Sequence, residues 1–378
     1  MTKPHVVVRL LGETSVRLWG LDLAEWQRRS WTKVGAAKVG TQDGRLLTGM
    51  EWVLSPALQR TLLATPGAAL LVEDGSGSGQ RLAALHLPDE VEADRFAGLV
   101  GQTIADPETL RAAGLTPGNV NDFADPYDKA LRKREAPYAL SLQETPPHKV
   151  ERVLFKGSYK GVTDLVTKYA WPIPAFHATR LAARLHLSPN MVTTASLGFV
   201  CLAFWFFWIG AWLPGILAAW SMTFLDTVDG KLARTTMTYS RWGNIYDHGI
   251  DLIHPPFWYW AIFHGLMQAP GGPSDGLLFM SLGAILVGYV LNRLEEGFFM
   301  RYFGFHIHVW RPIDSRARVI TARRNPNMLI FMLAVLVGQP GWGFVAIAVW
   351  TILCLVFHGV RLFQALAQPD KPVVWMES

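Results

Sequence analysis

Two long stretches of this chain carry no charged side chain, and they limit its possible folds more than any other feature. Residues 191–225 and 328–360 contain no Asp, Glu, Lys or Arg, and each is longer than the roughly 20 residues that a helix needs to cross a bilayer. A segment with glycine and proline divides each stretch, at residues 210–215 and 338–343. Each stretch therefore predicts two membrane-spanning helices joined by a short turn.

Two further apolar segments, residues 243–267 and 277–293, bring the expected number of membrane-spanning helices to six. The connections after the second and fourth spans are rich in Lys and Arg, whereas those after the first, third and fifth contain neither. Because positively charged loops stay on the cytoplasmic side, both termini are expected to be cytoplasmic. The pattern indicates a multi-pass protein of the inner (cytoplasmic) membrane.

The beginning of the chain differs in composition and predicts a soluble α/β domain. The whole chain is 50% hydrophobic, but its mean hydropathy is only +0.19, so part of it must be polar. Aliphatic runs at 5–11, 68–73 and 81–87 predict strands, and residues 21–34 predict a helix. The expected fold is therefore a soluble α/β domain followed by an all-α membrane domain of six transmembrane helices.

The two parts are expected to be joined by a basic, amphipathic segment that lies on the membrane surface. Residues 151–168 are the basic, amphipathic part, the prolines Pro172 and Pro174 should break the segment, and a helix is expected over 176–186. The expected boundaries are 1–150 for the soluble domain, 151–188 for the juxtamembrane segment, 189–367 for the membrane domain and 368–378 for a cytoplasmic tail.

Four aspartates lie at the ends of the second and third predicted spans, where carboxylates are costly and usually functional. Asp226 and Asp229 are three residues apart and Asp247 and Asp251 are four apart, so each pair shares one face of its helix. Four carboxylates so near to one another cannot all stay ionised without a cation. Mg²⁺, Mn²⁺ or Ca²⁺ suit such hard oxygen ligands. The pattern indicates a two-metal site for an in-line phosphoryl displacement.

Between the two pairs lie small residues and one arginine. Gly230, Ala233 and Gly243 leave room for the backbone of a ligand, and Arg234 offers a guanidinium fork suited to a diphosphate. The complete pattern, D-x2-D-G-x2-A-R-x8-G-x3-D-x3-D, resembles the signature of the CDP-alcohol phosphotransferases. The resemblance covers roughly residues 150–365. It implies a membrane enzyme that moves a substituted phosphate from a CDP-linked donor, such as CDP-diacylglycerol, to a hydroxyl acceptor and releases CMP in phospholipid biosynthesis.

The resemblance also implies roles for individual residues. Two divalent ions, Mg²⁺ or Mn²⁺, would be held by Asp226, Asp229, Asp247 and Asp251, and Asp251 would also be the general base. The CDP site would be lined by Gly230, Ala233, Arg234 and Gly243. The partners implied are the CDP-linked donor, the hydroxyl acceptor, membrane lipids and a second copy of the chain in a homodimer; no nucleic acid is expected.

Several alternatives stay open from the sequence. Glycerol phosphate, inositol, inositol phosphate, serine or a lipid alcohol could be the acceptor, and a fused-domain layout favours an inositol-phosphate type by analogy. Some family members carry a fused cytidylyltransferase domain, which residues 1–150 resemble in size, but residues 11–17 contain only one glycine. A degenerate nucleotidyltransferase-like domain without chemistry of its own is expected. Two rival functions fit the sequence less well. A membrane prenyltransferase would lack the Asp-Gly-x-x-Ala-Arg run, and a non-catalytic membrane scaffold would not need the aspartates.

Other polar residues near the predicted spans have simpler interpretations. Arginines within 301–324 could bind anionic lipid or a phosphate on the acceptor, and Arg293 could pair with Glu296 one helical turn away. His248 is expected to point away from the aspartates. The pair His306 and His308 has no acidic neighbour in the sequence, so a zinc site is not expected there.

Overall fold

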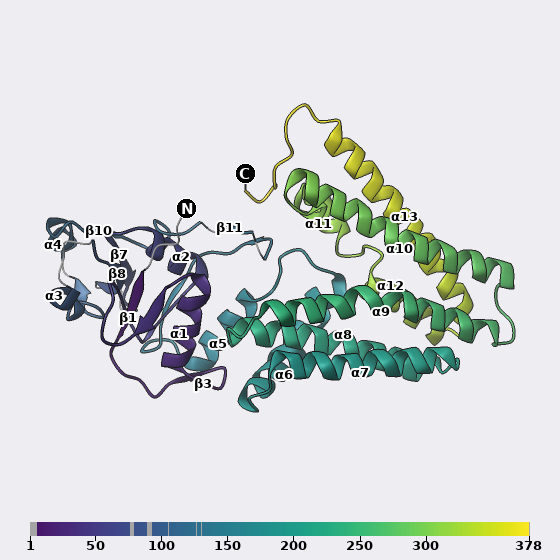
Figure 1. The fold of residues 1–378 in the computed structure, drawn as a ribbon, viewed down its shortest axis with the longest axis horizontal. Helices are drawn as coiled ribbons and strands as arrows, with labels where there is room; N and C mark the ends of the chain where they lie inside the picture. Colours follow the sequence, from purple (N-terminus) through teal and green to yellow (C-terminus); the bar gives the residue numbers. More distant parts are fainter. Residues whose placement is uncertain are drawn as a thin grey trace. The chain divides into compact units, whose positions relative to one another are not determined.

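The computed structural model describes residues 6–75, 79–88, 93–104, 106–125, 127–129 and 131–377. These residues form two compact units, each of which is described by itself. Unit 1 comprises Met1–Tyr159, Ala183–His186 and Leu232–Thr238, and unit 2 comprises Lys160–Ala182, Leu187–Lys231 and Tyr239–Ser378. Figure 1 shows a sheet with helices in unit 1 and a bundle of long helices in unit 2.

Unit 1 contains a mixed sheet in the order β10-β7-β8-β5-β1-β4, with β9 paired to β8. Its strands are β1 (Val7–Leu11), β4 (Lys38–Gly40), β5 (Leu46–Gly49), β7 (Ala68–Glu73), β8 (Gln80–His86), β9 (Thr103–Ile104) and β10 (Thr116–Gly118). Strand β1 is parallel to β4 and β5, whereas β8 runs antiparallel to β5 and β7. The three predicted strands are confirmed as β1, β7 and β8; residue 5 lies outside the described residues.

Smaller strand pairs and helices complete unit 1. The pairs join β2 (Arg17–Leu18) with β3 (Leu21–Asp22), β6 (Trp52–Leu54) with β13 (Ala139–Ser141), and β11 (Tyr127–Asp128) with β12 (Lys133–Arg134). The helices are α1 (Leu23–Val34), α2 (Pro56–Ala64), α3 (Ala93–Ala97), α4 (Glu108–Ala112) and α5 (Pro147–Gly157). Leu47, Leu85, Phe96 and Leu110 belong to one buried cluster, so α3 and α4 cover one face of the sheet.

Buried tryptophans hold unit 1 together. Trp19, Trp26, Trp31 and Trp52 are each at most 1% exposed. The indole Nε1 of Trp26 donates a 2.8 Å hydrogen bond to the carbonyl oxygen of Thr235, in the 232–238 piece of the unit. This buried hydrogen bond connects α1 to that piece.

Unit 2 consists mainly of long helices. They are α6 (Pro172–Arg184), α7 (Pro189–Trp208), α8 (Trp212–Thr235), α9 (Arg241–Met267), α10 (Asp275–Phe303), α11 (Pro312–Ala317), α12 (Arg324–Leu336) and α13 (Pro340–Leu366), with the last residues of α6 and α8 counted in unit 1. A π-helical turn, Val166–Ala170, and a 3₁₀ turn, Ile307–Val309, complete the set. Phe207, Trp258, Phe331 and Phe344 come from four of these helices and form its buried core.

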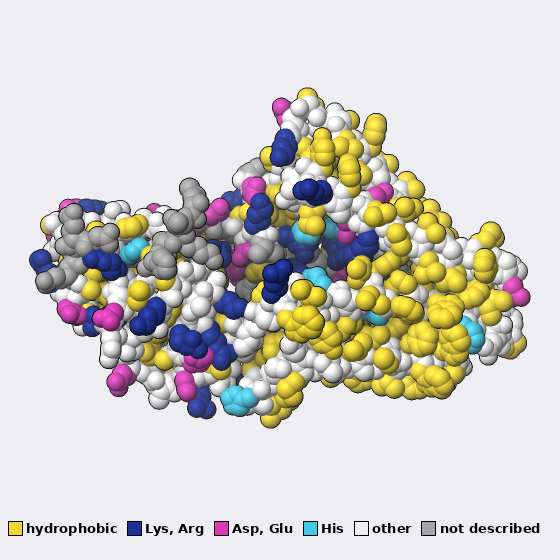
Figure 2. All heavy atoms as spheres, in the orientation of Figure 1, with side chains coloured by type: hydrophobic (Ala, Val, Ile, Leu, Met, Phe, Trp, Pro, Cys, Tyr) yellow, Lys and Arg dark blue, Asp and Glu magenta, His cyan; other side chains and the backbone are white. Residues whose placement is uncertain are grey.

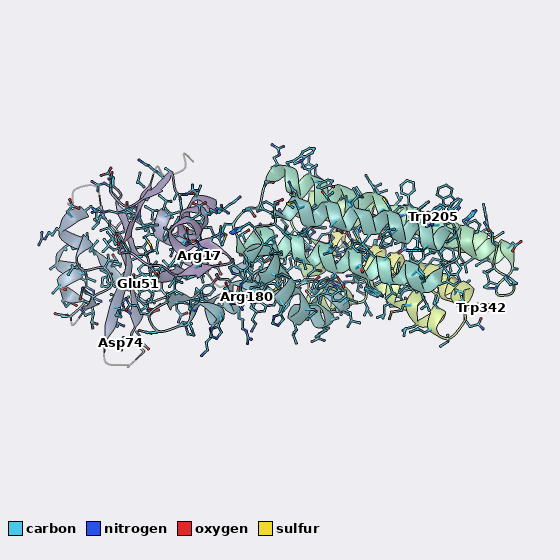
Figure 3. The ribbon with its side chains drawn as sticks, turned by 90° about the horizontal axis from the view of Figure 1, so that it is seen from below. Arg17, Glu51, Asp74, Arg180, Trp205 and Trp342 are labelled. Carbon is cyan, nitrogen blue, oxygen red and sulfur yellow. The ribbon has the colours of Figure 1, made fainter. Side chains whose placement is uncertain are left out.

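The outer surface of unit 2 is strongly apolar, as a membrane protein requires. Among the described residues, α7, α10 and α13 are long and apolar enough to cross a bilayer. Trp205 on α7 and Trp342 on α13 stand on the outside of the bundle and are 58% and 51% exposed (Figure 3). Figure 2 shows the hydrophobic side chains gathered over these helices, whereas charged side chains cover much of unit 1. Helices α8 and α9 carry the aspartates, and α12 has only 13 residues.

The connecting segment differs from its prediction in two respects. The amphipathic stretch 151–168 is not one continuous element, because α5 ends at Gly157 and the π-helical turn begins only at Val166. The expected break lies at Trp171, but α6 begins at Pro172 rather than at residue 176, so Pro172 and Pro174 lie in its first turn. The first turn of a helix has no internal partners for its N–H groups, so proline costs little there. Ile173 and Leu181 are 76% and 59% exposed, which fits a helix lying on a membrane surface.

Candidate metal centre

The four aspartates lie on two neighbouring helices of unit 2. Asp226 and Asp229 are in the second half of α8, and Asp247 and Asp251 are in the first turns of α9. Ser240 caps α9, and its hydroxyl accepts a 3.0 Å hydrogen bond from the N–H of Gly243. This cap sets where α9 begins and therefore the position of its two aspartates along the helix axis.

Three of the carboxylates form one compact group. Asp226, Asp229 and Asp247 each offer an oxygen, and these oxygens lie within 4.8 Å of one another. Asp229 is 3% exposed; its Oδ2 accepts a 2.6 Å hydrogen bond from the Thr193 hydroxyl, while its Oδ1 is buried and has no hydrogen-bond partner in the described part of the chain. A buried carboxylate oxygen without a partner, close to two more carboxylates, fits a hard divalent cation.

Asp251 lies outside this group and has a different partner. Its Oδ1 is 2.5 Å from Nη1 of Arg324, whose Nη2 is 2.6 Å from Oδ2 of Asp226. Arg324 is the first residue of α12, and its side chain is only 14% exposed. One guanidinium therefore connects an aspartate of α8 with an aspartate of α9.

The sequence did not single out Arg324 among the arginines of its loop. A signal was nevertheless present, because a cation in the first turn of a helix opposes the helix dipole and needs nearby anions. The prediction that His248 points away from the aspartates is wrong, because its Nδ1 is 3.5 Å from Oδ2 of Asp247. The two residues are adjacent in the sequence, so rotation about the side-chain bonds is enough to bring the imidazole to the carboxylate.

The residues assigned to CDP are placed along the same two helices. Gly230 and Ala233 follow Asp226 on α8 by four and seven positions, so they share its face, and Arg234 is in the last turn. A Cβ on Gly243 would lie 2.8 Å from Oδ1 of Asn190 on α7. A larger residue at position 243 would therefore have to displace the side chain of Asn190, and that of Ser240 at 3.0 Å.

A buried acid outside the membrane-spanning helices fixes the beginning of α12. Asp164 accepts hydrogen bonds from the N–H groups of Val166 and Thr167, from the Thr167 hydroxyl and from Nδ2 of Asn325, at 2.8–3.1 Å. Burial by itself would raise the pKa of Asp164, but these hydrogen bonds and the charge of Arg318 outweigh it, so its pKa lies below the usual range. Because Asn325 follows Arg324, Asp164 also limits where that arginine can lie.

This pKa shift predicts acid sensitivity. A carboxylate with a lowered pKa stabilises the fold at pH values above about 4, the pKa of an unfolded Asp, and this contribution is lost as pH falls through the lower, folded pKa. Asp164→Asn should lower the free energy of unfolding at pH 7 by about 1–3 kcal/mol, since its amide NH₂ group would face backbone donors. Melting curves in detergent between pH 3 and 7 should show a smaller acid-induced drop for the variant. The exposed Asp370, changed to Asn, is the control and should follow wild type.

A second polar group lies at the far end of α10. As predicted, Arg293 Nη1 is 3.5 Å from Oε2 of Glu296. The expectation that His308 lacks an acidic partner is wrong, because its Nε2 is 3.2 Å from Oε1 of Glu296, which also binds Arg323. The partner comes from a different helix and was therefore invisible to local spacing. Burial lowers the pKa of His308 well below its usual value despite Glu296, so the imidazole stays neutral.

Comparison with known proteins relates the sequence around this site to a family. Residues 186–302, which contain all four aspartates, match the family model described as CDP-alcohol phosphatidyltransferase. The chain carries a CDP-alcohol phosphatidyltransferase domain. The match ends before Arg324, so it does not include the arginine that bridges Asp226 and Asp251.

Three individual relatives support this family assignment. The chain is 28% identical over 164 residues to phosphatidylinositol phosphate synthase of Cutibacterium acnes, which covers 40% of this chain and 67% of that protein. It is 29% identical over 130 residues to ethanolaminephosphotransferase 1 of Mus musculus, covering 29% of this chain and 32% of the relative. A Schizosaccharomyces pombe protein of the same family is 32% identical over 85 residues, or 19% and 22% of the two chains. The family consists of membrane transferases of phospholipid synthesis, which agrees with the apolar helices of unit 2.

Proposed function

We propose that this protein transfers a substituted phosphate group from a CDP-linked donor to a hydroxyl acceptor and releases CMP. The observation that carries the proposal is the group of three carboxylates on α8 and α9, which lies inside the region that matches the family. A scaffold protein would have no use for a buried carboxylate oxygen without a hydrogen-bond partner, because such an oxygen destabilises the fold.

The donor set suits Mg²⁺ or Mn²⁺. Asp226, Asp229 and Asp247 would hold one ion, and Asp251 together with Asp226 would contribute to a second. Bound divalent ions would neutralise the donor diphosphate and stabilise the negative charge on the departing CMP.

The remaining steps belong to the side chains of the chain itself. Asp251 would take the proton from the acceptor hydroxyl. The acceptor oxygen then bonds to the β-phosphorus in line with the bond to CMP, which breaks. Gly230, Ala233 and Gly243 would leave space for CDP, and Arg234 would contact its phosphates as a fork.

The membrane arrangement is also part of the proposal. Six helices, α7, α8, α9, α10, α12 and α13, would cross the bilayer within residues 189–367, with α12 as the shortest. The basic residues of the loops after α8 and α10 favour a cytoplasmic position for those loops, for the aspartates and for both termini. Residues 1–150 would be a cytoplasmic nucleotidyltransferase-like domain without catalysis of its own, 151–188 a surface segment and 368–378 a tail. A homodimer is the proposed assembly.

Two substrate pairs are the leading candidates. The relative from C. acnes is named as a phosphatidylinositol phosphate synthase, which favours CDP-diacylglycerol with an inositol phosphate acceptor. The mouse relative is named as an ethanolaminephosphotransferase, which favours a CDP-linked ethanolamine donor with a lipid acceptor. The first match covers more of both chains, so we favour the inositol phosphate pair.

The test is CMP release by the purified protein in detergent with Mn²⁺ or Mg²⁺. One arm supplies CDP-diacylglycerol with inositol phosphate, glycerol phosphate, inositol or serine, and the other supplies CDP-ethanolamine with diacylglycerol. CMP release that depends on one acceptor, and that is lost in Asp229→Asn, is the expected result. No release in either arm by a protein that still folds would overturn the transferase proposal and favour a non-catalytic membrane scaffold.

A further inference from the structure

Arg324 has a place in the carboxylate cluster that the proposed reaction does not use. Its two terminal nitrogens bind different aspartates, Asp226 at 2.6 Å and Asp251 at 2.5 Å. The side chains of Arg324 and Asp226 are 14% and 19% exposed, whereas that of Asp251 is 42% exposed. Arg324 is thus bound to the two carboxylates, one from each helix, that a second divalent ion would need.

The backbone of Arg324 is held in this position from the other side. Asn325, the next residue, donates its Nδ2 to Oδ1 of Asp164 at 3.0 Å. Nη1 of Arg324 also lies 3.4 Å from the sulfur of Met222, one turn before Asp226 on α8. A cation at the start of a helix is unfavourable toward the helix dipole, so the two carboxylates are what stabilises it there.

The charges explain why a mobile cation is useful. Asp226 is shared between Arg324 and the group with Asp229 and Asp247. Without a cation, four carboxylates at this separation repel one another strongly. A guanidinium is always charged and binds phosphate oxygens as readily as carboxylates, so an incoming diphosphate offers it an alternative partner.

We infer that Arg324 is an internal counter-cation, which occupies Asp226 and Asp251 until the donor diphosphate draws its guanidinium away. In this scheme the group of Asp226, Asp229 and Asp247 can accept an ion at any time. Asp251 becomes free only after the CDP-linked donor binds. Donor and second ion then bind cooperatively, because each favours the departure of Arg324 from the carboxylates. The inference rests on the proposed function, since it takes the carboxylates to be the metal ligands.

The test measures Mn²⁺ binding rather than turnover. Full-length wild type, Arg324→Met and Arg324→Lys are titrated with Mn²⁺ in detergent, with and without CDP, and free Mn²⁺ is followed by electron paramagnetic resonance. Methionine keeps most of the side-chain length but removes the charge. Without CDP, Arg324→Met should bind Mn²⁺ at least about tenfold more tightly than wild type and should gain less from CDP, because a positive charge has left the carboxylates.

A control variant and the lysine variant test whether the charge of Arg324 causes the change in Mn²⁺ affinity. Arg301→Met, on the exposed end of α10, is the matched control and should titrate like wild type. Lysine cannot bridge two carboxylates as a fork, so Arg324→Lys should shift in the same direction by less, and it decides the matter if Arg324→Met does not fold. Equal Mn²⁺ affinity in wild type and both variants would overturn the counter-cation and leave the metal centre standing. Absence of Mn²⁺ binding in all proteins would overturn the proposed metal centre and this inference with it.

Discussion

Asp251→Asn is expected to lower the rate of CMP release by about 10²–10⁴-fold, the range typical for loss of a general base. The substitution keeps the size of the side chain but removes its ability to accept a proton at neutral pH. Because Asp251 lies outside the group of three carboxylates, Mn²⁺ binding to that group should be largely retained. CMP release and equilibrium binding of CDP, measured on the same preparation, separate these two effects.

The control is Asp275→Asn, an exposed acid in the first turn of α10, which should leave the rate unchanged. A variant Asp251→Asn that keeps its activity would remove the general-base role from this residue. A variant that loses both CMP release and Mn²⁺ binding would instead mean that Asp251 acts chiefly as a ligand.

Asp314→Ala is expected to have the largest effect on stability. Arg361 of α13 binds both oxygens of Asp314, through Nε at 2.6 Å and Nη2 at 2.9 Å, and their side chains are 9% and 2% exposed. Asp314 also accepts from the N–H of Arg311 and so caps α11. Removal of one partner leaves a buried charge, which typically costs about 3–5 kcal/mol of unfolding free energy. Thermal unfolding in detergent should show a loss of about 10 °C in Tm.

The double variant Asp314→Ala, Arg361→Met tests the cause of this loss. Replacement of both charges removes the unpaired guanidinium, so the double variant should recover a large part of the lost Tm. If the double variant is as unstable as Asp314→Ala alone, the loss comes from the cap on α11 and not from the stranded charge of Arg361.

Local patterns in the sequence gave the correct faces and boundaries wherever one element determined them. The spacing of Asp226 and Asp229 placed both on one face of α8, and the segment 210–215 correctly separated α7 from α8, although α8 already begins at Trp212. Short runs of aliphatic residues likewise predicted β1, β7 and β8. In each case the contacts that determine the element are between residues close together in the sequence.

Contacts between distant segments could not be predicted in the same way. Arg324 is 73 residues from Asp251 and 98 from Asp226, and His308 finds Glu296 across a turn between two helices. The local pattern marks Arg324 only as a cation in the first turn of a helix and does not say which aspartates it reaches. The sequence predicted six spans, whereas among the described residues three helices have the length and composition of a span. The other three differ from these because α8 and α9 carry the carboxylates and α12 has only 13 residues.

The discontinuous make-up of unit 1 has a consequence for its biosynthesis. The indole of Trp26 reaches its hydrogen-bond acceptor at Thr235, and a Cβ on Gly20 would lie 2.6 Å from the carbonyl oxygen of Ala183. A ribosome that has made only the first 159 residues has therefore not yet supplied two of the three pieces of this unit. Its tryptophan-rich core should close only after α7 and α8 have been synthesised, so nascent chains of intermediate length should remain sensitive to protease until residue 238 has emerged.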